Sequence, residues 1–400
     1  MNIGIVTTWF PRGAAYVSKA YRETFAAKHN VFIYARGGER YAQGDPEWDK
    51  DYVTWGKRFI GKDGTYVDWA DFKKWITKNQ LDLVLFNEQQ SWEVVLKATQ
   101  LSIPIGSYVD YYTAQTVPFF RLYDFLFCNT RRHYRVFQDH PQTFYIPWGT
   151  NIDLFKPRKQ DYAKKEITFF HSAGLSPDRK GTDILIRAFR EVRGNSKLII
   201  HTQSQRTLKQ YSLVRRMIAQ DQRVKLIEKE VEAPGLYHLG NVYVYPTRLE
   251  GVGLTIMEAL ASGLPVITTD APPMNEFITQ NIDGKLIKVA SVEDRPANYY
   301  WPRTVCDTDS LRAEMQFFVD NPDRIGEFQR HARLSAEEKF DWQKNSANLP
   351  AIVTKLAKIG ARTDTALIKA VVQYEQRSGG GFLKQAERAF RQFRKRRIRF

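Results

Sequence analysis

Cysteine is scarce in this chain, with two residues, Cys128 and Cys306, among 400. Two thiols cannot supply the disulfide framework of a small secreted domain, so we expect both to be reduced and buried or incidental. No apolar run approaches the roughly 20 residues that cross a bilayer. Residues 1–6 have the pattern of a strand and lack the basic start and apolar stretch of a signal peptide. We therefore expect a cytoplasmic protein that is at most attached to the inner face of a membrane.

Metal-ligand spacings are also missing from the sequence. No His, Cys or Asp set has the spacing of a metal site, and no Ser-His-Asp or reactive-cysteine arrangement is recognisable. We expect neither a metal nor a cofactor. His171 and His201 end predicted strands, and we interpret them as structural or pocket-lining residues.

The composition is that of a folded α/β protein with more than one core. Hydrophobic residues make up 43% and aromatic residues 14% of the chain, which excludes a disordered composition. A length of 400 residues favours two domains. Short apolar runs alternate with helical patterns in both halves, which predicts parallel sheets wrapped by helices, with ligands at the carboxyl ends of the strands. We expect strands at 3–8, 31–35, 81–86, 103–109, 125–128, 143–146, 167–171, 197–201, 224–228, 242–245 and 265–268, and helices at 16–28, 91–100, 182–192, 204–218, 254–262 and 309–319.

The most informative stretch is 246–265, PTRLEGVGLTIMEALASGLP. A predicted strand ends at Pro246, a turn with two glycines follows, and a helix is expected to begin near Leu254. The first amides of a helix lack intrahelical partners and lie at the positive end of its dipole, so they form an anion site. Glu250 in the turn and Glu258 in the helix can reach different ends of one bound molecule. A molecule with a phosphate in the middle and hydroxyls at both ends would fit the anion site and the two carboxylates, and a nucleotide sugar is such a molecule. The alternative interpretation is a surface helix whose carboxylates are solvated.

The spacing of Glu250 and Glu258 within E-G-x-G-L-x-x-x-E-A-L-A-S-G-x-P-V-I resembles the donor-site signature of retaining GT-B glycosyltransferases, in particular glycosyltransferase family 4, the glycosyl transferases group 1. The resemblance covers about residues 1–358 and implies the GT-B fold, in which two Rossmann-like domains face each other across a cleft and a C-terminal helix crosses back to the first. We assign an acceptor-side domain to 1–148, a donor-nucleotide domain to 149–340, the helix crossing back to 341–360 and a basic amphipathic tail to 361–400.

The resemblance also implies roles for individual residues. Glu258 would accept hydrogen bonds from the ribose hydroxyls, and Glu250 would contact the hydroxyls of the transferred sugar and stabilise positive charge as the glycosidic bond loosens. Backbone near Glu230 and Val231 would contact the base. The amides that would face the phosphates and the sugar belong to Gly251, Val252, Gly253, Leu254 and Thr255.

Arg179 and Lys180 follow the strand predicted at 167–171 and precede a helix, where they could grip a diphosphate. Lys180 matches the family pattern G-R-L-x-x-x-K-G, whereas Leu175 stands at the position of the usual arginine, a role that Arg179 could take over. As a bare feature, an Arg-Lys pair beside a helix start is also compatible with two solvated side chains.

Two candidates lie in the first half of the chain. Gly13 falls in the first strand-to-helix loop, where the family carries a glycine-rich turn near the phosphate, although glycine is also common in ordinary turns. Asp110 falls where family members often carry a histidine near the donor sugar. It could orient the acceptor hydroxyl or act as a base, or it could cap a helix or be a satisfied carboxylate. The aromatic segment 299–303, an insert before the helix expected at 309–319, could form a sugar platform or pack locally.

The basic charge is concentrated at the C-terminus. Residues 384–400 carry eight Lys or Arg and one acid, which is +7 of the net charge of +16. A basic helix with phenylalanines on one stripe predicts a surface that binds anionic membranes. Docking on the enzyme and binding of nucleic acid are the alternatives. The apolar residues that recur at helical spacing are Phe382, Ala386, Ala389, Phe390, Phe393 and Phe400.

Together these features predict a retaining, metal-independent hexosyltransferase of surface polysaccharide or glycolipid synthesis. It would move a sugar from a UDP- or GDP-sugar to a glycan or lipid-linked acceptor. The resemblance implies attack on the same face of the sugar, with the departing phosphate taking the proton of the acceptor. The rival interpretations are a non-catalytic module that binds sugar nucleotides, a sugar-nucleotide epimerase of the GT-B fold, and a nucleic-acid-binding protein.

Overall fold

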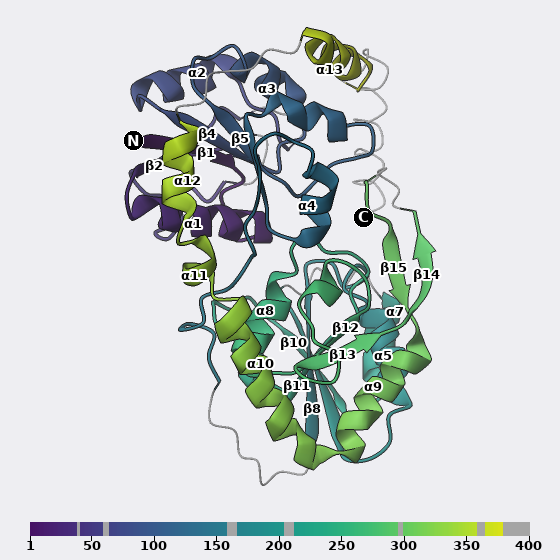
Figure 1. Cartoon of the computed structure of the whole chain (residues 1–400). Coiled ribbons are helices and arrows are strands. Elements are labelled where there is room, and N and C mark those ends of the chain that lie inside the picture. The colour runs from purple at the N-terminus through teal and green to yellow at the C-terminus, as the bar shows by residue number, and fades with distance from the viewer. Residues whose placement is uncertain are drawn as a thin grey trace. The chain divides into compact units, whose positions relative to one another are not determined.

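The computed structural model describes residues 1–37, 41–58, 64–157, 166–203, 212–294, 299–357 and 365–378. The chain divides into two compact units (Figure 1). Unit 1 comprises Met1–Asn129, His133–Tyr145 and Ala347–Phe400, and unit 2 comprises Thr130–Arg132 and Ile146–Ser346. Each unit contains its own parallel sheet with helices, which confirms the predicted α/β class.

Unit 1 is built on a seven-stranded parallel sheet in the order β3-β2-β1-β4-β5-β6-β7. Figure 1 shows α1 on one side of this sheet and α2 and α3 on the other. The strands are β1 (Asn2–Thr7), β2 (Asn30–Ala35), β3 (Val53–Trp55), β4 (Leu83–Asn87), β5 (Ile105–Tyr108), β6 (Phe125–Cys128) and β7 (Thr143–Tyr145). The helices of this part of the chain are α1 (Gly13–Ala26), α2 (Trp69–Lys78), α3 (Trp92–Ala98), the 3-10 helix η1 (Val117–Leu122) and α4 (Arg131–Phe137).

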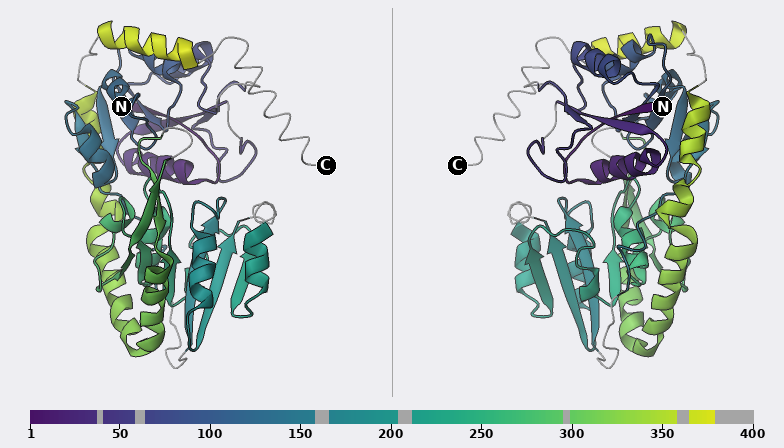
Figure 2. Two further views of the ribbon diagram at one scale, coloured as in Figure 1. Left: turned by 90° about the vertical axis from the view of Figure 1, so that its right-hand side faces the viewer. Right: turned by 90° about the vertical axis from the view of Figure 1, so that its left-hand side faces the viewer.

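The chain returns to unit 1 after Ser346. Helix α12 (Leu349–Leu356) packs on α1, and His29 Nε2 lies 3.1 Å from the carbonyl oxygen of Pro350. Helix α13 (Thr365–Ser378) packs on α3 and η1, and the Glu375 carboxylate accepts a 2.7 Å hydrogen bond from the Trp92 amide. Figure 2 shows α13, in yellow, beside the blue helices of unit 1. The predicted return of a C-terminal helix to the first domain is confirmed.

Unit 2 is built on a six-stranded parallel sheet in the order β10-β9-β8-β11-β12-β13, with a separate antiparallel ribbon of β14 and β15. The strands are β8 (Ile167–Gly174), β9 (Ser196–Thr202), β10 (Val224–Glu228), β11 (Val242–Tyr245), β12 (Val266–Thr269), β13 (Gly284–Ile287), β14 (Val289–Glu293) and β15 (Arg303–Cys306). The helices are α5 (Thr182–Arg190), α7 (Ser212–Ala219), η2 (Tyr237–Leu239), α8 (Leu254–Ala261), η3 (Met274–Glu276), α9 (Thr308–Asp320), η4 (Pro322–Arg324), α10 (Ile325–Lys339) and α11 (Trp342–Ser346).

In both sheets the strands follow the chain order 3-2-1-4-5-6, counted from the first strand of each unit, which is the Rossmann order. Strands covered by helices on both faces consist of near-continuous apolar runs, and all four residues of β11 are buried. Helix α5 turns Leu185 and Phe189 to the core while Arg190 remains exposed. Helix α8 is buried along most of its length and packs on α10. The sheets therefore account for most of the predicted strands.

The structure corrects several sequence predictions. The edge strands β3 and β13 and the helix α2 were not predicted. The aromatic segment 299–303 precedes α9 as expected, and its last residue, Arg303, begins β15, which was not predicted and pairs with β14. Of the helix predicted at 204–218, residues 204–211 lie outside the described residues, as do the basic tail residues 379–400. Within the described ranges, no helix combines the length and apolarity that a bilayer crossing requires.

Candidate functional site

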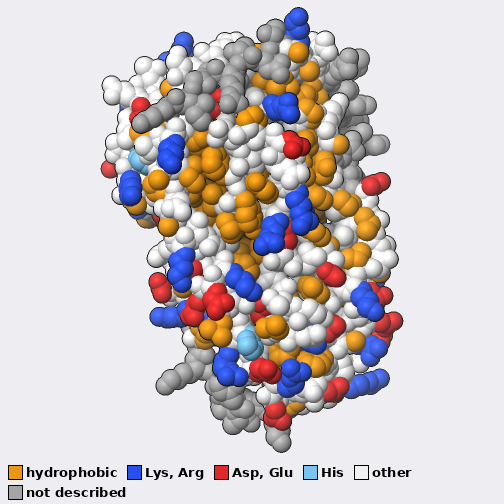
Figure 3. Space-filling model, viewed as in Figure 1, with side chains coloured by type: hydrophobic (Ala, Val, Ile, Leu, Met, Phe, Trp, Pro, Cys, Tyr) orange, Lys and Arg blue, Asp and Glu red, His pale blue; other side chains and the backbone are white. Residues whose placement is uncertain are grey.

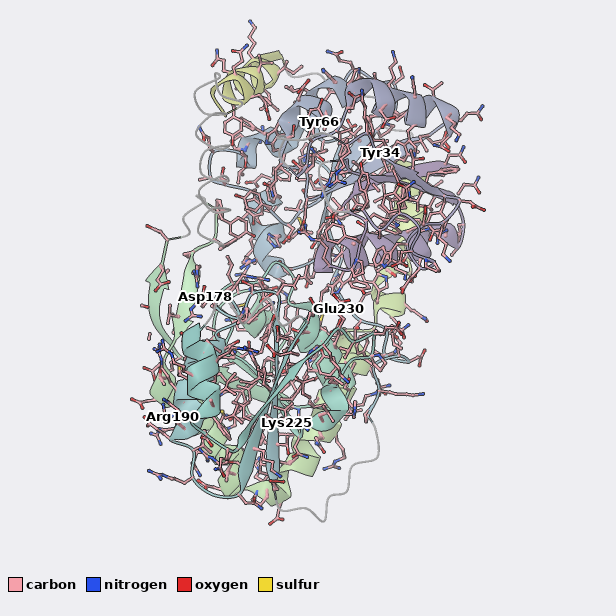
Figure 4. The ribbon with its side chains drawn as sticks, turned by 180° about the vertical axis from the view of Figure 1, so that it is seen from behind. Tyr34, Tyr66, Asp178, Arg190, Lys225 and Glu230 are labelled. Atoms are coloured by element: carbon pink, nitrogen blue, oxygen red, sulfur yellow. The ribbon has the colours of Figure 1, made fainter. Side chains whose placement is uncertain are left out.

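The candidate site lies at the carboxyl edge of the sheet in unit 2. Strands β8 and β11 are neighbours at the centre, and the strand order reverses between them. Connections leave such a pair toward opposite sides and open a crevice, which is the usual ligand position in this fold. In Figure 4, Asp178 and Glu230 lie at this edge, whereas Arg190 and Lys225 lie toward the other end of the sheet. The segments 179–180 and 246–253 follow β8 and β11 respectively, so the topology brings both to the crevice.

Glu250 is the centre of a polar cluster in this crevice. Its side chain is buried, and Oε1 lies 2.7 Å from Lys180 Nζ. The same oxygen accepts hydrogen bonds from the Thr247 hydroxyl at 2.6 Å and from the Tyr245 hydroxyl at 2.9 Å. Arg179 Nη1 lies 3.4 Å from the other carboxylate oxygen. The predicted residues Arg179, Lys180 and Glu250 are therefore in contact, which leaves two cations beside one anion.

The charges of this cluster determine its ionisation. Burial alone would raise the pKa of Glu250, but the Lys180 ammonium and the Arg179 guanidinium outweigh burial and lower this pKa to about 2. Burial lowers the pKa of Lys180 to about 8, although the Glu250 carboxylate opposes the shift. At neutral pH the carboxylate is ionised and the ammonium is mostly protonated. The cluster then carries a net positive charge that an anionic ligand can neutralise.

The loops after β8 and β11 are fixed to each other by backbone contacts. Gly181 is the N-cap of α5 with φ of +70°, and a Cβ atom there would lie 2.0 Å from the carbonyl oxygen of Pro246. The carbonyl oxygen of Arg179 accepts hydrogen bonds from the Arg248 amide at 2.8 Å and from the Thr247 hydroxyl at 3.1 Å. Arg248 in turn binds the Asp183 carboxylate through two nitrogens, at 2.9 and 3.0 Å. These contacts hold Arg179 and Lys180 beside Glu250.

Helix α8 begins where the sequence predicted it. Gly253 is the N-cap with φ of +81° and provides no side-chain cap, so no N-cap side chain accepts from the amides of the first turn. Of the predicted amides, those of Gly251 and Val252 belong to the turn and those of Leu254 and Thr255 belong to the first helical turn. Their arrangement is that of an anion site at a helix N-terminus.

Glu258 lies further along α8 and has a different environment from Glu250. The Tyr237 hydroxyl donates a 2.6 Å hydrogen bond to Glu258 Oε2. Burial raises the pKa of Glu258, even though this hydrogen bond and the more distant Lys180 oppose the shift. The two carboxylates thus occupy opposite ends of one row of tyrosines, Tyr237, Tyr243 and Tyr245, in which neighbouring ring centroids are 5.6 and 5.4 Å apart.

The residues predicted near the base follow β10. Glu230 is exposed and Val231 is half-buried. The preceding residue, Lys229, is fixed through its backbone, because its amide donates to the carbonyl oxygen of Thr202 at 3.1 Å and its carbonyl oxygen lies 2.9 Å from His201 Nε2. His171 is structural, since its two ring nitrogens lie 2.8 Å from the Val244 carbonyl oxygen and the Thr182 hydroxyl.

Gly13 and Asp110 belong to unit 1, whereas the cluster belongs to unit 2. Gly13 is the first residue of α1. Asp110 follows β5, and its carboxylate lies 3.8 Å from Nε2 of the buried His133. Burial and the neighbouring Asp110 raise the pKa of Glu88, which follows β4, to about 8. Glu88 also pairs with Arg12 at 3.4 Å, where the strand order of this sheet reverses between β1 and β4. Sequence analysis missed Glu88 and His133, since neither has a recognisable motif.

Across the described ranges, no group of three or more His, Cys, Asp or Glu residues is arranged to hold a metal ion. The absence of a resident metal stays a prediction.

The sequence did contain a signal for two of the tyrosines that sequence analysis missed. Alternate residues of a strand share a face, so Tyr243 and Tyr245 in the run Val-Tyr-Val-Tyr had to lie on one side of the sheet.

Comparisons with known proteins agree with this geometry. The family model described as glycosyl transferases group 1 matches residues 166–297, which include the cluster and α8. The chain is 24% identical over 226 residues to the MMP alpha-(1->4)-mannosyltransferase of Mycolicibacterium hassiacum, covering 55% of this chain and 50% of that protein. It is 26% identical over 327 residues to the UDP-N-acetylglucosamine–peptide N-acetylglucosaminyltransferase GtfA subunit of Streptococcus pneumoniae, covering 70% of this chain and 61% of that protein. The chain thus spans about half to three fifths of these relatives.

Solved structures share the fold over nearly the whole chain. HepE of Anabaena in complex with UDP and glucose superposes with a TM-score of 0.69 at 17% identity, covering 89% of this chain and 100% of that chain. A glycosyltransferase from Rickettsia africae superposes with a TM-score of 0.71 at 15% identity, covering 89% of this chain and 98% of that chain. Both sheets therefore follow the GT-B arrangement of strands.

Proposed function

We propose that the chain is a member of the glycosyl transferases group 1, whose model matches residues 166–297, and that it transfers a sugar from a UDP- or GDP-linked donor to a glycan or lipid-linked acceptor. The observation that carries this proposal is the pairing of Lys180 with Glu250, 2.7 Å apart, at the point of strand reversal beside the N-terminus of α8. Cations, helix amides and a carboxylate meet there, as a sugar diphosphate requires.

Each part of the donor has a matching group in unit 2. Glu258 would accept from the ribose hydroxyls, and Arg179, Lys180 and the amides at the start of α8 would neutralise the diphosphate. Glu250 would bind the hydroxyls of the transferred sugar. In the proposed reaction the bond from the anomeric carbon to the diphosphate breaks and a bond to the acceptor oxygen forms on the same face. The acceptor proton passes to the departing phosphate, and the nucleoside diphosphate is released.

We further propose that this reaction needs no resident metal. Two basic side chains, Arg179 and Lys180, lie beside Glu250, where the diphosphate would bind, and preorganised cations can supply the charge that stabilises a leaving phosphate. Transfer that persists unchanged in the presence of EDTA would support this part of the proposal. Loss of transfer in EDTA, with recovery on addition of Mg²⁺ or Mn²⁺, would contradict it.

The test of the donor site is a thermal-shift panel of nucleoside diphosphates and nucleotide sugars on the wild type and on Glu258→Ala. A ligand at one hundred times its dissociation constant should stabilise the wild type by about 2.7 kcal/mol. Stabilisation by one base series, lost in Glu258→Ala, identifies the nucleotide. Glu191→Ala is the matched control, because Glu191 is an exposed carboxylate at the C-terminal end of α5 and should leave the shift unchanged. No stabilisation of the wild type by any nucleotide would overturn the proposal.

Binding alone does not distinguish an enzyme from a sugar-nucleotide-binding module or an epimerase. Radiolabelled donor sugar should appear on an added glycan or lipid-linked acceptor, with release of free nucleoside diphosphate. A product that stays attached to the nucleotide would favour the epimerase, and binding without either product would favour the module.

A nucleic-acid role has less support, since Figure 3 shows Lys and Arg interspersed with Asp and Glu on the face of unit 2 that carries α9 and α10.

We propose that the protein acts at the inner face of a membrane, where the segment 382–400 would bind anionic lipid. The support is its sequence pattern of basic residues around a phenylalanine stripe. A lipid-linked acceptor would suit that location.

A further inference from the structure

The row of three tyrosines in unit 2 connects the two carboxylates of the candidate site. Tyr245 donates to Glu250 at 2.9 Å, and Tyr237 donates to Glu258 at 2.6 Å. Tyr243 lies between them, with its ring stacked on Tyr245 at an interplanar angle of 23° and in edge contact with Tyr237. The hydroxyls at both ends of the row are therefore committed to carboxylates.

The central hydroxyl is different. Tyr243 is fully buried, and its hydroxyl meets no hydrogen-bond partner among the described residues. The same is true, within the described part of the chain, of the Thr255 hydroxyl in the first turn of α8. The hydroxyls of Thr255 and Ser172 lie close enough to lower the pKa of Tyr243, but burial outweighs them and raises this pKa well above its usual value. Tyr243 is thus a neutral donor at any physiological pH.

A buried hydroxyl without a hydrogen-bond partner lowers the stability of the folded protein. Leaving such a group unsatisfied costs about 1–3 kcal/mol, and phenylalanine would fill the same space without that cost. The hydroxyls of Tyr243 and Thr255 lie close to each other, and Thr255 belongs to the first turn of α8, whose N-cap is Gly253. Helix amides, the dipole and the nearby Lys180 all favour an anion there. The unpartnered donors therefore point to an anionic ligand.

The order of the tyrosines also matches the order of a nucleotide sugar. Under the proposed function, on which this step rests, Glu258 binds the ribose and Glu250 binds the transferred sugar. The diphosphate lies between ribose and sugar, and Tyr243 lies between Tyr237 and Tyr245. We infer that the hydroxyls of Tyr243 and Thr255 donate hydrogen bonds to the diphosphate and are binding residues of the donor site. They supply donors without adding charge to a site that already holds two cations.

The variant that tests this inference is Tyr243→Phe, with Tyr237→Phe as a matched control in the same row. Affinities for UDP, GDP and the corresponding nucleosides are measured by calorimetry, or by competition where the nucleoside is weak. Loss of one hydrogen bond to a charged group should weaken nucleoside diphosphate binding by about 10- to 100-fold in Tyr243→Phe, with nucleoside binding unchanged. Tyr237→Phe, which frees the ribose-side carboxylate, should change nucleoside and diphosphate binding by the same factor.

Stability provides a second readout. Removing an unpartnered hydroxyl should leave the melting temperature of the free protein unchanged or raise it, whereas removing a structural hydrogen bond would lower it. Thr255→Val serves as an independent variant should Tyr243→Phe fold poorly, and it should show the same selective loss of diphosphate binding. Unchanged diphosphate affinity in both variants, or equal losses for nucleoside and diphosphate, would overturn the inference alone. Absence of any nucleotide binding by the wild type would overturn the proposed function and this inference with it.

Discussion

The Nζ atom of Lys180 lies 2.7 Å from Oε1 of Glu250 and joins the loop after β8 to the loop after β11, where the strand order of unit 2 reverses. Both side chains are largely buried, with exposed fractions of 12% and 7%. Movement of one loop relative to the other would therefore strain or break this ion pair. The same two groups that would bind the donor also hold the crevice together, and this coupling makes the pair testable by stability as well as by binding.

Lys180→Met should destabilise the protein by about 3 kcal/mol or more, because it leaves the Glu250 carboxylate buried without its main counter-charge. The double variant Lys180→Met/Glu250→Gln should lose less, since no buried charge is left unpaired. Urea denaturation of the wild type, both single variants and the double variant measures the coupling. Strictly additive losses would show that the pair contributes nothing as a pair.

Acid should remove the stabilisation that Glu250 provides. Its folded pKa of about 2 lies below its ordinary value of 4.5. A carboxyl of this kind stabilises the fold above the ordinary value and loses that contribution as the pH falls through the folded value. The stability advantage of the wild type over Glu250→Gln should therefore shrink between about pH 4.5 and pH 2. Urea midpoints of both proteins across this range measure it, and a constant difference would contradict the prediction.

Alkali should weaken donor binding through Lys180. Because burial lowers the pKa of this ammonium to about 8, the free protein loses the charge above that pH. The dissociation constant for a nucleoside diphosphate should then rise about tenfold for each further pH unit. Lys180→Arg keeps its charge, so its affinity should show no such dependence between pH 7 and 9.5. Equal pH profiles for the two proteins would assign the titration to another group.

Gly181 and Gly253 should respond differently to alanine. Both have positive φ, but a Cβ at Gly181 would lie 2.0 Å from the Pro246 carbonyl oxygen, whereas at Gly253 the nearest atom is 3.4 Å away. Gly253→Ala should cost about 1–2 kcal/mol of backbone strain. Gly181→Ala should cost clearly more, because the loops after β8 and β11 must separate. Thermal unfolding and nucleotide affinity of the two variants provide the comparison, and equal losses would contradict it.

Removal of residues 382–400 should abolish binding to vesicles that contain phosphatidylserine and leave nucleotide binding intact. The prediction rests on the basic residues and phenylalanines of that segment. Sedimentation with vesicles at 0.1 M salt measures it, with neutral phosphatidylcholine vesicles as the control. Undiminished binding of the shortened chain to anionic vesicles would place the lipid-binding surface elsewhere.

The sequence predicted the parts of this fold whose patterns are local. Central strands such as β1, β8 and β11 are apolar runs bounded by turn residues. Helix α8 follows Gly253, whose φ of +81° is a backbone conformation that favours glycine. Of the four edge strands, β7 and β10 were predicted, whereas β3 and β13 were missed. The strand β3 consists of three half-buried residues, so its sequence has no apolar run that marks a strand. Helix α2 was missed although Asp68 caps it through the Asp71 amide, since aromatic residues dominate its apolar face.

The candidate site was predictable where a motif spans it and not where tertiary structure assembles it. Glu250, Glu258, Arg179 and Lys180 were identified from short spacings, but the contact of Arg179 and Lys180 with Glu250 depends on β8 and β11 being neighbours. Tyr237 could not be connected with Glu258 from sequence, because the two residues come from η2 and α8 and meet only in the folded unit. The proximity of Asp110 to His133 likewise depends on the folding of unit 1.

The division of the chain has a consequence for the order in which the protein is made. Unit 2 contains nearly all of its residues between Ile146 and Ser346, whereas unit 1 also includes the later helices α12 and α13. Domains generally fold during synthesis as their residues leave the ribosome. Unit 2 can therefore reach nearly its final set of contacts before α12 has been made. Until then α1 of unit 1 lacks the helix that packs on it. A chain that stalls near Ser346 would therefore hold nearly all residues of unit 2 but lack α12 and α13 of unit 1.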